Sequence, residues 1–242
     1  MNRQHLHAVA DGWLRPVADG LVAVLLAPVC AACHDPLEQP TRGAVCAGCW
    51  SAAVPSTPLD CDALPPFITL ATAIGPYEGR LRDIIQALKY DPRPTIAQPL
   101  AFHMRDAGFD LLADADVVVP VPLHRSRERA RGFNQARKLA VHLGLPVCEM
   151  LVRTRRTESQ ADLPAARRHA NVRGAFAASP KAPALKTGVK NRIVVLVDDV
   201  WTTGATLNAC ATALRAAGAS DVRALTAARA TLRAFKAGRS PR

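Results

Sequence analysis

Two familiar nucleotide-binding motifs are missing from this 242-residue chain. The pattern Gly-x-x-x-x-Gly-Lys-Ser/Thr does not occur, which excludes a P-loop NTPase, and the lack of Gly-x-Gly-x-x-Gly argues against a dinucleotide-binding fold. A long apolar run is missing too. The run at residues 21–29 is broken by Pro28, whereas a membrane-spanning helix needs ~20 residues. No dense basic stretch precedes it, so a signal peptide is not predicted. We therefore expect a cytoplasmic protein without a membrane span.

Aromatic residues are also scarce, at 5% of the chain, whereas 49% of the residues are hydrophobic. Ala, Val and Leu supply most of the apolar surface, which suits helices packed on a Val-rich sheet better than an all-β sandwich. Near the start, Leu14, Val17, Leu21 and Leu25 recur at helical spacing. This spacing predicts an amphipathic helix that packs on its own protein.

Acidic residues are few relative to basic ones, 20 against 31, which gives a net charge of +11. The surplus is clustered in two segments, residues 124–138 and 153–173, each with six basic residues. Clustered positive charge favours an anionic partner, either nucleic acid or a phosphorylated small molecule. The alternative is a generally Arg-rich chain whose charges are solvated.

Cysteines are concentrated near the front of the chain, in two pairs of the form Cys-x-x-Cys: Cys30 with Cys33 and Cys46 with Cys49. Two such pairs supply the four thiolates that a structural Zn²⁺ prefers. The alternatives are disulfides, which a reducing compartment disfavours, and unrelated buried cysteines. Cys61 is left over as a spare thiol or as half of a degenerate second pair. Cys148 and Cys210 lie in apolar contexts and are predicted to be core residues.

Short Val-rich runs alternate with helical patterns after a Pro-rich linker at residues 55–66. This alternation predicts an α/β fold with a doubly wound, mainly parallel sheet. The strands are expected at residues 68–73, 117–122, 173–177, 193–197 and 222–228. The helices are expected at residues 81–89, 95–107, 134–144 and 203–218.

The stretch VVLVDDVWTTGATL, residues 194–207, carries the chemistry. The strand is expected to end at Asp198 and Asp199, and a helix to start within residues 202–206. The loop between them offers hydroxyls, a glycine and the N–H groups of a helix N-terminus, which together form a phosphate cradle. Carboxylates beside it can accept hydrogen bonds from sugar hydroxyls, so the pattern predicts a phosphorylated sugar as ligand. The alternative is an ordinary strand-turn-helix in which a threonine caps the helix.

These residues resemble the signature of type I phosphoribosyltransferases, and the match extends over Asp198, Asp199, Thr202, Thr203, Gly204, Ala205 and Thr206. More narrowly, the chain is similar to the ComF/GntX family of competence-associated proteins. Four further stretches carry this resemblance: the paired cysteines, ALKY at residues 87–90, the Pro- and Arg-rich segment 118–140, and the segment 153–176. Two domains are expected, a helix with a zinc module at residues 1–62 and a phosphoribosyltransferase-like domain at residues 63–242.

The resemblance implies that the two acids bind the ribose hydroxyls of phosphoribosyl pyrophosphate and that residues 202–206 bind its 5′-phosphate. It also implies that Mg²⁺ accompanies the ligand. Pyrophosphate would bind the loop that begins near Val121 and Pro122, with Arg125 and Arg131 as candidate contacts. By the same resemblance, the segment 153–176 would form a lid over the site, with the candidate contacts Gln160, Arg167, Arg168 and Asn171.

Two functions remain open at this point. The chain is either a phosphoribosyltransferase that acts on a nitrogen acceptor, or a non-catalytic factor that binds single-stranded DNA and retains the ligand site. The resemblance implies a role in competence and DNA uptake, with DNA and competence-machinery proteins as candidate partners.

Overall fold

A computed structural model of the chain describes residues 15–16, 18–61, 64–90, 94–155, 174–179 and 188–230. The elements with assigned bounds are η1 (Pro40–Arg42), α2 (Ala47–Ala53), β1 (Leu59–Asp60), β2 (Ala71–Pro76), α3 (Gly79–Tyr90), α4 (Pro94–Ala107), α5 (Phe109–Leu112), β3 (Val117–Pro120), α6 (Arg125–Arg131), α7 (Gln135–Ala140), β4 (Leu151–Arg153), β5 (Phe176–Ala178), β6 (Ile193–Trp201), α9 (Ala205–Ala216) and β7 (Asp221–Arg229).

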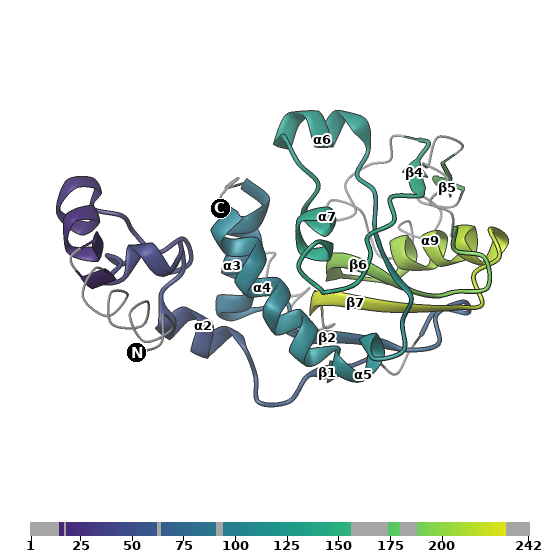
Figure 1. Cartoon of the computed structure of the whole chain (residues 1–242), viewed down its shortest axis with the longest axis horizontal. Helices are drawn as coiled ribbons and strands as arrows, with labels where there is room; N and C mark the ends of the chain where they lie inside the picture. Colours follow the sequence, from purple (N-terminus) through teal and green to yellow (C-terminus); the bar gives the residue numbers. More distant parts are fainter. Residues whose placement is uncertain are drawn as a thin grey trace, which may run out of the picture.

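A five-stranded sheet in the order β1-β2-β7-β6-β3 forms the centre of the structure (Figure 1). Strands β2, β7, β6 and β3 are parallel, and β1 is antiparallel to β2. The predicted α/β fold with a mainly parallel sheet is therefore confirmed. Strand β1 falls inside the stretch predicted as a linker, which is wrong for these two residues. Because β1 lies at the sheet edge, the prolines around it cost no ladder hydrogen bonds.

Helices cover both faces of the sheet. Along β6, Val195 and Val197 join the core formed by α3, α4 and α7, whereas Val194 and Leu196 join the core formed with α9. This alternation is the period-two pattern of a strand buried on both faces. In α9, Cys210 is fully buried, and Cys148 after α7 is 5% exposed. The prediction that both cysteines are core residues is confirmed.

Several predicted elements differ from the structure. The strand expected at residues 173–177 is β5, which pairs with β4 outside the main sheet, and the helix expected at residues 134–144 is the shorter α7. The strand expected to end at Val197 continues to Trp201, because Val200 and Trp201 still pair with Ala228 and Arg229 of β7. The Arg-rich segment expected as a loop contains the helix α6, which stands clear of the sheet at the top of Figure 1. Gly132 ends this helix in the left-handed conformation, with φ of 79°, as glycine after a helix commonly does.

The cysteine-containing segment packs against α3 and α4. Arg80, in the first turn of α3, donates to the Ala32 carbonyl oxygen at 3.2 Å, and the Trp50 ring lies 5.2 Å from the ring of His103 in α4. The buried side chains of the segment belong to the same apolar cluster as those of α3 and α4. The expected domain boundary after residue 62 stays a prediction.

The first described helical residues, 15–16 and 18–26, differ from expectation in their packing. Leu21 and Leu25 are 59% and 75% exposed, so the prediction that this helix buries them against its own protein is wrong. The predicted contributions of Leu14 and Val17 lie outside the described residues. Of the helices that the structure describes, none combines the length and apolar character that a bilayer crossing requires.

Candidate functional site

The two acids of the motif lie within β6. Asp198 is paired in register with Thr226 of β7. The Asp198 Oδ1 atom accepts from the Asp199 N–H at 2.9 Å, and the Asp199 Oδ1 atom accepts from the Val200 N–H at 3.0 Å. Each carboxylate is thus fixed through its Oδ1 atom by the next peptide group.

The Oδ2 atom of Asp199 is buried, and the Lys89 ammonium, from the last turn of α3, lies 2.9 Å from it. The two groups form an ion pair. Because a carboxylate oxygen carries two lone pairs, Oδ2 can accept from a ligand hydroxyl while it stays paired with Lys89.

The pKa values of the two acids are shifted in opposite directions. Burial and then the Asp199 charge raise the pKa of Asp198 well above its usual range. Burial acts in the same direction on Asp199, but the Lys89 ammonium outweighs it and lowers the pKa of Asp199. Burial also acts to lower the pKa of Lys89, and the Asp199 charge overcomes it, so the pKa of Lys89 is raised. Asp199 is therefore the acid that holds its negative charge in the ligand-free site.

The loop after β6 is short, and the side chains of Trp201 and Pro65 pack closely against its glycine. It comprises Thr202, Thr203 and Gly204, and α9 begins at Ala205. Gly204 adopts φ of 75°, and a Cβ atom there would lie 3.0 Å from Nε1 of Trp201 and 3.3 Å from Cγ of Pro65. Only glycine fits such a position without displacing its neighbours.

The same loop tests the alternative in which a threonine caps α9. The residue at the cap is Gly204, which brings no side-chain acceptor to the first turn. The Thr203 Oγ1 atom accepts from the Ala205 N–H at 3.4 Å, a long contact. An N-terminus of a twelve-residue helix that is capped by glycine and flanked by hydroxyls is an anion-binding arrangement.

The predicted pyrophosphate loop leaves β3 beside the acids. The Val121 N–H donates to the Val197 carbonyl oxygen at 2.9 Å, and the Val121 carbonyl oxygen accepts from Nδ2 of Asn134 at 3.0 Å. Asn134 also caps α7, since its side-chain oxygen accepts from the Ala136 N–H. Asn134 thereby ties together the two ends of the segment that contains α6.

The predicted contacts Val121 and Pro122 directly follow β3, whereas Arg125 and Arg131 are the first and last residues of α6. Arg125 is exposed and Arg131 is half-buried. Their predicted role toward pyrophosphate stays a prediction.

The predicted lid begins and ends in the two-stranded ribbon β4–β5. Arg153 is paired with Phe176, and its guanidinium lies 5.2 Å from the centre of the Phe176 ring. Burial lowers the pKa of Arg153, the Arg127 charge lowers it further, and the Asp198 charge opposes both. The charges of α6 and of the acid pair thus both act on Arg153 at the base of the ribbon. The candidate lid contacts Gln160, Arg167, Arg168 and Asn171 lie outside the described residues.

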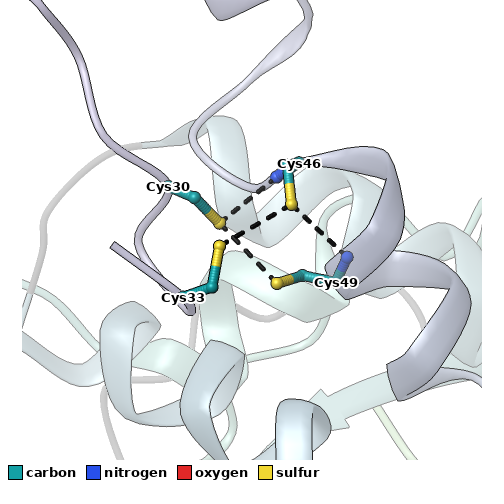
Figure 2. Close-up of side chains that lie close together, drawn as sticks. All are labelled: Cys30, Cys33, Cys46 and Cys49. Carbon is teal, nitrogen blue, oxygen red and sulfur yellow. Dashed lines mark hydrogen bonds between the residues drawn. The ribbon is translucent and has the colours of Figure 1, made fainter. Parts of the chain in front are cut away.

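The four paired cysteines form a second site. The Sγ atoms of Cys30, Cys33, Cys46 and Cys49 all lie within 4.8 Å of one another (Figure 2). Cys30 and Cys49 are 3.8 Å apart, and Cys33 and Cys46 are 3.9 Å apart. Tetrahedral Zn–S bonds of about 2.3 Å would separate the sulfurs by about 3.8 Å, so the donor set fits Zn²⁺.

Backbone amides support this cluster. The Cys46 N–H donates to the Cys30 sulfur at 3.3 Å, and the Cys49 N–H donates to the Cys46 sulfur at 3.4 Å. Burial acts to raise the pKa of Cys30, but N–H groups of Cys46, Cys33 and Ala32 together lower it to about 6. Such bonds favour thiolates and orient them for a metal. Cys61 lies apart from this cluster, buried beside β1 in the core on the α9 face of the sheet.

Comparisons of sequence agree with this geometry. Residues 114–236 match the phosphoribosyl transferase domain family. Competence protein F of Haemophilus influenzae is 34% identical over 167 residues, which cover 65% of this chain and 71% of that protein. DNA utilization protein YhgH of Salmonella typhimurium is 32% identical over 209 residues, which cover 80% of this chain and 87% of that protein. The chain belongs to the ComF family.

Solved structures similar to this ComF-family chain are more distant. An allosteric regulatory enzyme of purine biosynthesis is 24% identical, with a TM-score of 0.37, and the match covers 59% of this chain and 30% of that one. The adenine phosphoribosyl transferase of Trypanosoma brucei is 16% identical, with a TM-score of 0.36, over 69% and 72% of the two chains. The family assignment rests on the sequence matches.

Two features of this ComF-family site were missed or ranked low by sequence reasoning. Lys89 is visible in the sequence only as a basic residue in the last turn of a helix, which complements the helix dipole without implying a partner. Pro65 approaches Gly204 from a stretch expected to be a linker. Neither contact has a local sequence signal, because each joins segments more than 100 positions apart.

Proposed function

We propose that this protein binds phosphoribosyl pyrophosphate with Mg²⁺ and transfers its phosphoribosyl group to a nitrogen acceptor. The observation that carries the proposal is the buried Asp199 carboxylate, on the strand that leads into a glycine-capped helix N-terminus. A carboxylate acceptor adjacent to an anion cradle matches a ligand with vicinal hydroxyls and a phosphate. The membership of the ComF family and the phosphoribosyl transferase domain supports the same substrate class.

The reaction is a displacement at the anomeric carbon. The C1–O bond breaks and its electron pair leaves with pyrophosphate, a C1–N bond forms, and the acceptor nitrogen loses a proton. Asp198 and Asp199 would hold the ribose hydroxyls, and residues 202–206 would hold the 5′-phosphate. Mg²⁺, held by the pyrophosphate oxygens, would neutralise charge on the leaving group. Arg125 and Arg131 are proposed to add to this neutralisation.

In the cysteine site, Cys30, Cys33, Cys46 and Cys49 would hold a structural Zn²⁺. A four-thiolate site leaves no open position for substrate, and its contribution is to folding. We therefore propose that the zinc site stabilises the segment that packs on α3 and α4.

The test of ligand binding is calorimetric titration of the zinc-loaded protein with phosphoribosyl pyrophosphate and Mg²⁺. The matched control is the variant Asp198→Asn/Asp199→Asn, which keeps the shape of both side chains and removes their charges. We expect micromolar binding by the wild type and its loss in the variant. Equal binding by the two proteins, or no binding by the wild type, would contradict the proposal. A screen of acceptor bases for pyrophosphate release would then test transfer.

The arrangement of α6 favours a second candidate function, the binding of single-stranded DNA. Four arginines lie on this seven-residue helix, which stands clear of the sheet (Figure 1). Contacts of arginines with phosphates release counterions, so affinity should fall steeply as salt rises. The names of the relatives, competence protein F and DNA utilization protein, agree with a partner of this kind.

This candidate is tested by measuring the salt dependence of oligonucleotide binding. The variant Arg125→Gln/Arg129→Gln removes two exposed charges from α6, and Arg42→Gln/Arg82→Gln removes two exposed charges elsewhere. We expect the first variant to lower the slope of log affinity against log salt by about 1 to 2. A matching decrease in the second variant would show that the charge of α6 is not special.

A further inference from the structure

Lys89 connects two layers of the structure at the candidate ribose site. Its ammonium, on the last turn of α3, lies 2.9 Å from Oδ2 of Asp199 on β6, and the two side chains are 18% and 14% exposed. Helix α3 is anchored in the core by its own fully buried side chains, among them Ile84 and Ile85. The anchored helix therefore holds the Lys89 ammonium beside the Asp199 carboxylate.

The groups that surround this ion pair hold Lys89 in place. The ammonium lies 5.7 Å from the centre of the Tyr77 ring, and Nε2 of Gln86 donates to the Tyr77 hydroxyl. Lys89 on α3 acts on Asp199 through its charge, and Asp198 on the same strand acts on Asp199 through a hydrogen bond. Tyr77, which follows β2, and Asp198 are the further titratable groups that act on Lys89. Lys89 is the cation among these groups.

We propose that Lys89 is a positioning residue for the ribose site, which holds the Asp199 carboxylate in place and compensates its charge so that Oδ2 can accept from a ribose hydroxyl. The inference rests on the proposed function. Two adjacent buried carboxylates repel each other and also repel the phosphates of an incoming ligand. A cation that pairs with Oδ2 reduces that repulsion, and the second lone pair of the oxygen can still accept from a hydroxyl.

The charge balance gives this role a pH signature. Without Lys89, the burial of Asp199 would raise the pKa of Asp199, so the acid would be protonated at a higher pH. Protonation removes the strong acceptor, and ligand binding would weaken as the pH falls. In the wild type the lowered pKa of Asp199 keeps the acid charged over the same range.

The test is calorimetric titration with phosphoribosyl pyrophosphate and Mg²⁺ between about pH 6 and pH 8, where one unit of pKa change alters the charged fraction up to tenfold. We expect Lys89→Met to bind about tenfold or more weakly than the wild type at the acidic end, with a smaller deficit at the alkaline end. Lys89→Arg, which keeps the charge, should restore the flat pH profile. The control Lys190→Met removes an exposed ammonium elsewhere and should behave as the wild type.

A double-mutant cycle keeps the inference testable if Lys89→Met folds poorly, because Lys89→Met/Asp199→Asn leaves no unpaired charge. If Lys89 acts through Asp199, the double variant should bind no more weakly than Asp199→Asn alone. Additive losses, or a pH-independent Lys89→Met that binds as tightly as the wild type, would overturn the inference while the proposed function stands. Absence of binding by the wild type would overturn both.

Discussion

Replacing Gly204 by alanine should damage both the stability of the protein and its binding site. Gly204 adopts φ of 75°, and the added Cβ would lie 3.0 Å from Nε1 of Trp201 and 3.3 Å from Cγ of Pro65. The left-handed conformation costs an alanine about 1–2 kcal/mol. Both contacts involve a ring, and Trp201 is 3% exposed, so we add about 1–3 kcal/mol for overpacking.

Gly144→Ala is the matched control for this substitution. Gly144 also has a positive φ, 86°, but no atom lies within 4 Å of the added Cβ. The control therefore carries the backbone cost alone, together with the same change in the entropy of the unfolded chain. The difference between the two variants isolates the contacts with Trp201 and Pro65.

The assay is thermal unfolding of both variants, followed by ligand titration. For a chain of this size, each kcal/mol lowers Tm by about 2–4 °C. We expect Gly144→Ala to lose about 2–8 °C and Gly204→Ala about 4–20 °C. Displacement of the loop should also weaken phosphoribosyl pyrophosphate binding about tenfold, the equivalent of about 1.4 kcal/mol, in Gly204→Ala alone. Equal Tm values for the two variants would refute the packing argument, and unchanged binding would refute the role of the loop.

Three further outcomes are expected. Cys33→Ser should lower bound zinc per chain, whereas Cys61→Ser should not, as measured by a chromophoric chelator after unfolding; equal zinc loss in both would place Cys61 in the site. Thr226→Val should raise the free energy of unfolding by about 1 kcal/mol in denaturant titrations, because the fully buried Thr226 hydroxyl has no hydrogen bond to the described residues. A clear destabilisation would show that this hydroxyl does have a partner. Asn134→Ala should cost about 1–3 kcal/mol in the same assay, since it removes the cap of α7 and the bond to Val121, and a neutral result would show that neither bond contributes.

The parts of the fold that sequence reasoning predicted well are those with a strong local pattern. Helix α4 was expected at residues 95–107 and spans Pro94–Ala107, because its apolar residues recur at helical spacing. The end of β6 was misjudged, because two adjacent acids read as the end of a strand. The ladder with β7, which continues to Trp201, overrides that local signal. Helix α6 was missed although Gly132 marks its end, because its charged residues offer no apolar period.

The clustering of the four cysteines was predicted from the sequence and is confirmed, and the acid pair and the glycine of the loop were predicted as site residues, since their chemistry depends on residue type and short spacing. The sequence could not reveal that Lys89 lies against Asp199, or that Trp201 and Pro65 back Gly204. Those contacts depend on how α3, β6 and the stretch after β1 are brought together by the sheet. Residue type and spacing thus determined which groups are present, and only the tertiary structure decided their neighbours, because burial and charge compensation act through space between segments far apart in the chain.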